Sequence, residues 1–139
     1  MSPVDAVGDT QRQPITADED VVRIRQLVRN LAVAAKLSLV DQTKLVTAAS
    51  ELARNTLVYG GGGYADVVTV SNGTRIGVRV SFVDDGPGIA DLDLAMTDGY
   101  TSGSGLGLGL SGARRLVDEF DIDTAAGQGT RITVTKWSR

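Results

Sequence analysis

Two long segments in the first half of the chain place their inward-facing residues at the spacing of an α-helix. The first spans residues 18–36 and the second spans residues 41–59. The positions are Val21, Ile24, Val28, Leu31 and Ala35 in the first segment, and Leu45, Ala48, Ala49, Leu52 and Thr56 in the second. Side chains three and four positions apart share one helix face, so the pattern predicts two amphipathic helices. We expect Asp18 or Asp20 to cap the first and the glycines at 60–63 to end the second.

Alternation of apolar and polar residues predicts strands after the second helix. Residues 64–71 and 75–83 alternate, and the Asn-Gly pair between them favours a hairpin turn. In the second of these strands one face carries Ile76, Val78, Val80 and Phe82. Residues 121–137 read as a second hairpin, and a short strand is predicted over residues 11–16.

The remaining segments complete the predicted domain. Residues 86–105 are rich in Gly, Asp, Ser and Thr and lack periodicity, which is typical of a long functional loop. Helical spacing resumes over residues 107–120. We expect residues 1–9 to form a disordered tail and residues 10–139 to form one domain. Helices followed by hairpins predict an α+β fold, a two-layer α/β sandwich with a mostly antiparallel mixed sheet and helices on one face.

Composition narrows the chemistry. The chain of 139 residues contains neither Cys nor His, which excludes thiolate and imidazole metal sites and phosphohistidine chemistry. The net charge is −3 and no dense basic cluster is present, so nucleic acid is not an expected partner. No apolar run approaches the roughly 18 residues that span a bilayer, and the first residues lack the features of a signal peptide. We therefore expect a cytoplasmic protein that does not bind membranes.

The stretch SFVDDGPGI (81–89) is the first candidate for chemistry. Strand parity places Asp84 on the apolar face and Asp85 on the opposite face. A carboxylate on an apolar face is costly unless it is satisfied, and an amine of a flat ring such as adenine would satisfy it. Gly86 and Gly88 remove side chains where such a ring could approach. The alternative is an ordinary turn in which Asp84 caps backbone amides.

The second candidate is the pair Glu51 and Asn55 within SELARNTL (50–57). Residues four apart lie on one helix face, one turn from each other. A carboxylate can act as a general base, and an amide oxygen suits a hard cation such as magnesium. The alternatives are a solvated helix face and a contact between Glu51 and Arg54.

The third candidate is the glycine-rich stretch SGSGLGLGLSGARR (102–115), which leads into the last predicted helix. Exposed backbone N–H groups before a helix favour phosphate binding. The Lys-containing P-loop motif is absent here. A flexible linker is the alternative, although linkers seldom alternate Gly with Leu. Together, the three candidates supply the parts of a magnesium–ATP site.

At these residues the chain resembles the GHKL group of gyrase, heat-shock chaperone, histidine kinase and MutL proteins, which share the Bergerat ATP-binding fold. ELARN resembles the N box of that group, DDGPGI its first glycine box, GSGLGLGL its second, and GQGTRITV its final segment. The resemblance covers about residues 16–137. Within the group, the chain is most similar to small anti-sigma-factor-type serine/threonine kinases, closest to the RsbT-type switch kinases of bacterial stress signalling.

The resemblance implies a role for each matching residue. Glu51 would be the general base toward a Ser or Thr hydroxyl, Asn55 would bind magnesium, and Asp84 would accept from the adenine amino group. Residues 93–104 would form a lid over the nucleotide. The other implied nucleotide-binding residues are Gly86, Gly88, Ile89 and Thr130 near the base and Gly103, Ser104, Gly105, Leu106, Gly107, Leu108 and Gly109 near the phosphates.

The function implied is that of a protein kinase which uses ATP and magnesium to phosphorylate a small STAS-domain antagonist protein in a partner-switching pathway. Such kinases also bind a sigma factor or a regulatory protein phosphatase. The alternative is a nucleotide-gated protein-binding module with little kinase activity. A histidine kinase fragment is disfavoured because the chain lacks His, and a clamp ATPase needs a longer chain. No particular oligomeric state is predicted.

Overall fold

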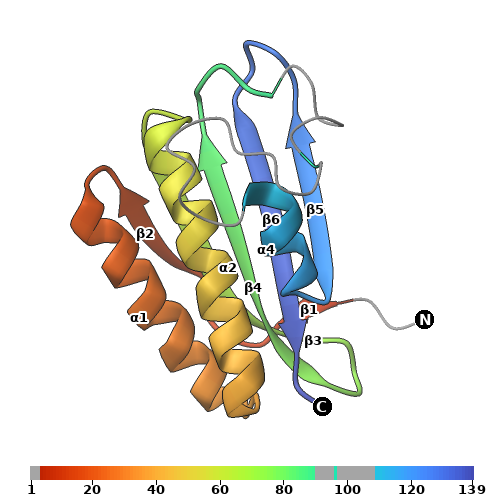
Figure 1. The fold of residues 1–139 in the computed structure, drawn as a ribbon. Coiled ribbons are helices and arrows are strands. Elements are labelled where there is room, and N and C mark those ends of the chain that lie inside the picture. Colours follow the sequence, from red (N-terminus) through yellow and green to blue (C-terminus); the bar gives the residue numbers. More distant parts are fainter. Residues whose placement is uncertain (1–3, 90–95, 97–108) are drawn as a thin grey trace.

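The computed structural model describes residues 4–89, 96 and 109–139 (Figure 1). In chain order, the elements are β1 (Asp5–Ala6), β2 (Gln11–Ile15), α1 (Asp18–Ala34), α2 (Leu39–Val58), β3 (Gly63–Ser71), β4 (Ile76–Asp84), α4 (Gly109–Arg115), β5 (Glu119–Thr124) and β6 (Thr130–Trp137). This order of two helices, a hairpin, a short helix and a second hairpin follows the sequence-based prediction.

The strands form one six-stranded sheet in the order β1-β3-β4-β6-β5, and β2 also pairs with β3. Every strand pair in the described part of the chain is antiparallel. Figure 1 shows α1, α2 and α4 together on one face of this sheet. The predicted α+β two-layer sandwich is confirmed. β4 is its central strand, flanked by β3 and β6, so the end of β4 lies in the middle of the sheet.

The core fills the space between the sheet and the helices. The sheet residues in this core come from alternate positions, as expected for the face that the helices cover. They include Ala65, Val67, Val78, Val80, Phe82 and Val134, and the helical stripes contribute Val21, Ile24, Val28, Leu45, Ala48, Ala49 and Leu52. The predicted inward faces of both long helices are therefore confirmed.

Both long helices begin with a capping interaction, of which the sequence predicted only a part: Asp20 takes part in the first, although it is not the N-cap residue, and no cap was predicted for the second. Ala17 is the N-cap of α1, and the Asp20 carboxylate reaches back to accept from the Thr16 and Ala17 N–H groups at 2.9 and 3.1 Å. In α2, the Ser38 hydroxyl accepts from the Asp41 N–H at 3.1 Å. This serine cap starts the helix two residues before the predicted position, because it satisfies N–H groups that would otherwise lack a partner.

Two predictions of local structure were wrong. The helix predicted over 107–120 ends at Arg115, and Phe120 belongs to β5, where it pairs with Val134. Leu116, Val117 and Phe120 suit both a helical and an alternating pattern, so periodicity alone could not place the boundary. Within the tail predicted over 1–9, β1 pairs with Val70 and Ser71 of β3.

None of the helices in the described part of the chain is both long and apolar enough to cross a membrane.

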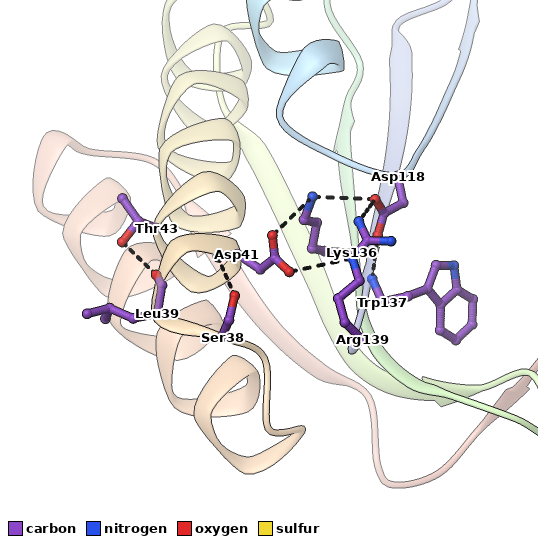
Figure 2. A network of polar contacts seen from close by, with 8 residues as sticks. All are labelled: Ser38, Leu39, Asp41, Thr43, Asp118, Lys136, Trp137 and Arg139. Atoms are coloured by element: carbon purple, nitrogen blue, oxygen red, sulfur yellow. Dashed lines mark hydrogen bonds and ion pairs between the residues drawn. The ribbon is translucent and has the colours of Figure 1, made fainter.

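A buried ionic cluster joins the end of β6 to the start of α2 (Figure 2). The Lys136 ammonium lies 3.6 Å from an Asp41 oxygen and 3.4 Å from an Asp118 oxygen, and Lys136 is only 4% exposed. Arg139 contacts the same two carboxylates from the surface side. Burial raises the pKa of Asp118, but the Trp137 N–H and the charges of Lys136 and Arg139 outweigh burial and hold that pKa below its usual value.

We expect Lys136→Met to destabilise the fold by about 3 kcal/mol, because the buried Asp41 carboxylate loses the buried ammonium beside it and keeps only the exposed Arg139 as a cation neighbour among the described residues. Urea unfolding followed by circular dichroism measures this loss. Arg139→Met is the matched control, since the Arg139 side chain is 58% exposed and such pairs contribute at most about 1 kcal/mol. Equal losses in the two variants would show that the buried cluster adds nothing beyond a surface ion pair.

Candidate functional site

Asp84 ends the central strand of the sheet on the side covered by the helices. It pairs with Gly63 of β3 and with Thr130 of β6. Phe82 is buried, Asp84 is half-buried and Asp85 is exposed. The strand-parity prediction that separates the two neighbouring aspartates is therefore confirmed. Asp84 therefore lies at the edge of the core, whereas Asp85 faces solvent.

The surroundings of the Asp84 carboxylate affect both its hydrogen bonding and its pKa. The Gly86 N–H donates to Oδ1 at 2.8 Å. Burial is the largest influence and raises the pKa of Asp84, as does the charge of Asp85, and the N–H groups of Gly86 and Thr130 oppose the rise only in part. A half-buried carboxylate with a raised pKa gains from a further N–H donor, because that donor replaces water lost on burial. An amino group on a flat base supplies such a donor.

The glycines behind Asp84 pack against protein backbone. A Cβ atom added at Gly86 would lie 2.8 Å from the Cα of Gly60, and one at Gly88 would overlap the carbonyl oxygen of Ala125. Gly88 also has a φ of 74°, which favours glycine. The missing side chains therefore let the loop close onto its neighbours, which corrects the hypothesis that they simply leave room for a ring. A ligand would meet these residues through their backbone.

Thr130 lies opposite Asp84, on the same strand face as Ile132 and Val134, as predicted. Its hydroxyl lies 2.9 Å from the hydroxyl of Thr124. Thr124 in turn accepts from the Ile89 N–H at 2.9 Å and donates to the Gly129 carbonyl at 3.1 Å. Thr124 thus fastens the loop after β4 to the β5–β6 hairpin. Sequence reasoning missed it, although its register with Thr130 in the predicted hairpin was a usable signal.

Glu51 and Asn55 project from the second half of α2. Glu51 is only 8% exposed, so the alternative of a solvated helix face is wrong for this residue. Its Oε1 atom accepts from the N–H of Gly109, the first residue of α4, at 3.0 Å. Asn55 is half-buried, and its backbone carbonyl accepts from the N–H groups of Tyr59 and Gly60. The carboxylate therefore holds the start of α4 against α2.

Most of the predicted phosphate-binding segment lies outside the described residues. This holds for Gly103, Ser104, Gly105, Leu106, Gly107 and Leu108, and for the lid predicted over 93–104 apart from Met96. Gly109 is described, and it meets Glu51 as above. The structure therefore brings the end of the glycine-rich segment to the carboxylate–amide pair on α2.

The metal-binding capacity of the site rests on few protein atoms. Within residues 4–89, 96 and 109–139, no group of three or more acidic, His or Cys residues could hold a metal ion. Magnesium does not require such a group, because it is commonly held by one or two side chains together with substrate phosphates and water. The Asn55 amide, one turn from Glu51, fits this mode of binding.

Two of the candidate residues lie on α2, and Asp84 lies at the end of β4, against the C-terminal end of α2. Figure 1 shows α2 lying across the face of the sheet near β4, with α4 beside it. Asp84 offers an acceptor to a base, and the glycine-walled loop around it admits backbone contact only. Glu51 lies at the start of α4, where its carboxylate accepts from the Gly109 N–H, and Asn55 follows one turn later on α2.

Comparison with known proteins gives several matches. Residues 40–138 match the family of histidine kinase-, DNA gyrase B- and HSP90-like ATPases. The chain is 42% identical to the serine/threonine-protein kinase RsbT of Bacillus subtilis over 125 residues, covering 90% of this chain and 94% of that protein. It is 32% identical to the anti-sigma F factor of Clostridium novyi over 116 residues, covering 76% of this chain and 81% of that protein.

One solved structure supports the fold. The chain superimposes on a Mycobacterium tuberculosis protein that contains RsbU and RsbW domains, with a TM-score of 0.65 and 19% sequence identity. The match covers 95% of this chain and 33% of that chain. The likeness confirms the arrangement of helices over an antiparallel sheet.

Proposed function

Because the chain belongs to the family of histidine kinase-, DNA gyrase B- and HSP90-like ATPases, we propose that it is an ATP- and Mg²⁺-dependent protein serine/threonine kinase. The similarity to the kinase RsbT over nearly the full length of both chains supports this assignment. The observation that carries it is the buried Glu51 carboxylate at the start of α4, one helical turn from Asn55. Phosphoryl transfer needs a positioned base and a cation ligand, and this pair offers both.

Each residue has a distinct task in this proposal. Asp84 accepts a hydrogen bond from the adenine amino group, and Thr130 supports the wall of the base pocket together with Gly86, Gly88 and Ile89. Asn55 ligates magnesium, and residues 103–109 approach the phosphates. ATP supplies the phosphoryl group. Glu51 takes the proton from the Ser or Thr hydroxyl of a protein substrate, a transfer to which a general base typically contributes about 10²–10⁴-fold in rate.

The substrate that we propose is a small STAS-domain antagonist protein in a partner-switching stress pathway. A sigma factor or a regulatory protein phosphatase is the proposed downstream partner, and the cytoplasm is the proposed location. The relatives named RsbT and anti-sigma F factor support a place in this class of pathway.

The second candidate function is a nucleotide-gated binding module with little kinase activity. The anti-sigma F factor relatives favour it, since a factor of that name acts against a sigma factor. In such a module the nucleotide would fix the segment between β4 and α4, and that segment would bind or release a partner.

A phosphotransfer assay distinguishes the two functions. The purified chain is incubated with labelled ATP, Mg²⁺ and a STAS-domain protein, and mass spectrometry locates any modified residue. We expect one phosphorylated Ser or Thr on the STAS protein, and no transfer when EDTA removes the cation. ATP binding without transfer to any partner would instead support the binding module.

A further inference from the structure

Gly60 is the glycine that lies directly against the Asp84 side chain. It follows the C-cap residue of α2, Tyr59. A Cβ atom added at Gly60 would lie 2.6 Å from both the Cβ and the Oδ2 atoms of Asp84 and would also overlap its Cγ. Real Cβ atoms essentially never approach another heavy atom so closely. Any side chain at position 60 would therefore compete with the carboxylate for the same space.

The crowding has no simple relief. Rotation of the Asp84 side chain would move Oδ2, but it would leave the Asp84 Cβ where strand pairing with Gly63 and Thr130 holds it. On the other side, the Gly60 N–H donates to the Asn55 carbonyl at 3.2 Å, which ties this residue to α2. A Cβ added at Gly86 would likewise lie only 2.8 Å from the Gly60 Cα and carbonyl oxygen.

Space alone requires glycine at this position. The next two residues, Gly61 and Gly62, have φ values of 77° and 104°, where L side chains are strained, but Gly60 is not in that region. Alanine would therefore suit the backbone conformation of residue 60. The consequence of Gly60→Ala can be assigned to the contact with Asp84 rather than to backbone strain.

We propose that Gly60 is a positioning residue for the nucleotide base: its lack of a side chain leaves the space in which the Asp84 carboxylate adopts the orientation that accepts from adenine. The inference rests on the proposed function of Asp84 as the adenine acceptor. The Gly60 N–H donates to the Asn55 backbone carbonyl, and the space beside the Gly60 Cα is filled by the Asp84 side chain. The C-terminal end of α2 therefore packs directly against the proposed base acceptor.

The first test compares the Gly86 amide in the ligand-free Gly60→Ala variant and in the native chain. In the native chain this amide donates to Asp84 Oδ1. We expect the Gly86 amide resonance to shift in ¹H–¹⁵N spectra and its hydrogen exchange to accelerate, because the carboxylate has moved. ATP affinity, measured by isothermal titration calorimetry, is expected to fall at least tenfold. Gly8→Ala is the matched control, because nothing lies within 4 Å of a Cβ there, and it should leave both measurements unchanged.

A second variant covers the case in which Gly60→Ala folds poorly. In Asp84→Gly the atoms that meet the new Cβ are gone. We therefore expect Gly60→Ala to lower the Tm by about 5 °C in the wild-type background and by much less in the Asp84→Gly background. Equal losses in both backgrounds would overturn the proposal, and so would a Gly60→Ala protein with native ATP affinity and an unshifted Gly86 amide. If the wild-type chain itself bound no ATP, the proposed function would fail, whereas the Gly86 and Tm results would still report on the Gly60–Asp84 contact.

Discussion

Asp84→Asn is expected to weaken ATP binding about a hundredfold, which corresponds to about 2.7 kcal/mol. The reason is that the substituted amide cannot satisfy both of its neighbours. The Asp84 carboxylate accepts from the Gly86 N–H through Oδ1, and the proposed adenine contact needs a second acceptor. An asparagine has one acceptor oxygen and one NH₂ group. One of the two donors, Gly86 N–H or the adenine amine, would therefore face another donor.

Asp85→Asn is the matched control for this prediction. Asp85 is exposed on the other side of the strand end, so its change should alter ATP affinity less than twofold. Isothermal titration calorimetry with Mg²⁺–ATP measures both variants, and thermal unfolding verifies that they are folded. Similar losses of affinity in Asp84→Asn and Asp85→Asn would contradict the assignment of the acceptor.

The pH dependence of ATP binding gives an independent measure of the same group. Burial, aided by the Asp85 charge, raises the pKa of Asp84 despite the opposing N–H groups of Gly86 and Thr130. Only the ionised carboxylate offers acceptors on both oxygens, so the affinity should fall as the pH drops through this raised pKa. The fall begins at a higher pH than for an ordinary Asp with a pKa of about 3.9. The Asp84→Asn variant lacks this titrating group. Its pH profile of affinity therefore shows the contribution of the ATP phosphates without that of Asp84.

Local pattern was sufficient to predict much of the fold and the placement of Asp84. The helices cover one face of the antiparallel sheet, and Phe82 and Asp84 occupy alternate positions on that face. The alternation in β4 therefore predicts that Asp84, and not Asp85, faces the core. The stripe on α2 likewise placed Glu51 at the edge of the buried surface. Both predictions depend on neighbours within one element, and such relations can be read directly from sequence spacing.

The features that sequence reasoning missed depend on contacts between distant segments. Gly60 matters because β3 and β4 pair so that Gly63 lies opposite Asp84, and no local pattern predicts that register. Thr124 gains its role through the Ile89 N–H, which lies 35 residues away along the chain. Lys136 gains its role through a cluster that joins β6 to α2. The glycines after Asp84 accommodate backbone of other segments, at Gly60 and Ala125, and local pattern does not reveal such neighbours.

Glu51→Gln is expected to lower the rate of phosphoryl transfer about 10²–10⁴-fold, the usual contribution of a general base, while ATP remains bound. Glutamine keeps the oxygen that accepts from the Gly109 N–H, so the start of α4 should stay in place. What is lost is the capacity of residue 51 to take a proton from the substrate hydroxyl. Single-turnover transfer at saturating ATP measures this loss separately from binding.

Glu51→Ala separates the role of Glu51 as a base from its role in holding α4. The alanine variant also loses the hydrogen bond to Gly109, and bonds to charged groups contribute about 1.5–3 kcal/mol. Both variants should therefore lose transfer, but only Glu51→Ala should lower the stability of the fold. Glu19→Gln, at an exposed position in the first turn of α1, is the control for loss of a negative charge. If Glu51→Gln transferred phosphate at the native rate while Glu51→Ala did not, then Glu51 would act by holding the start of α4, and the base would have to be a different group.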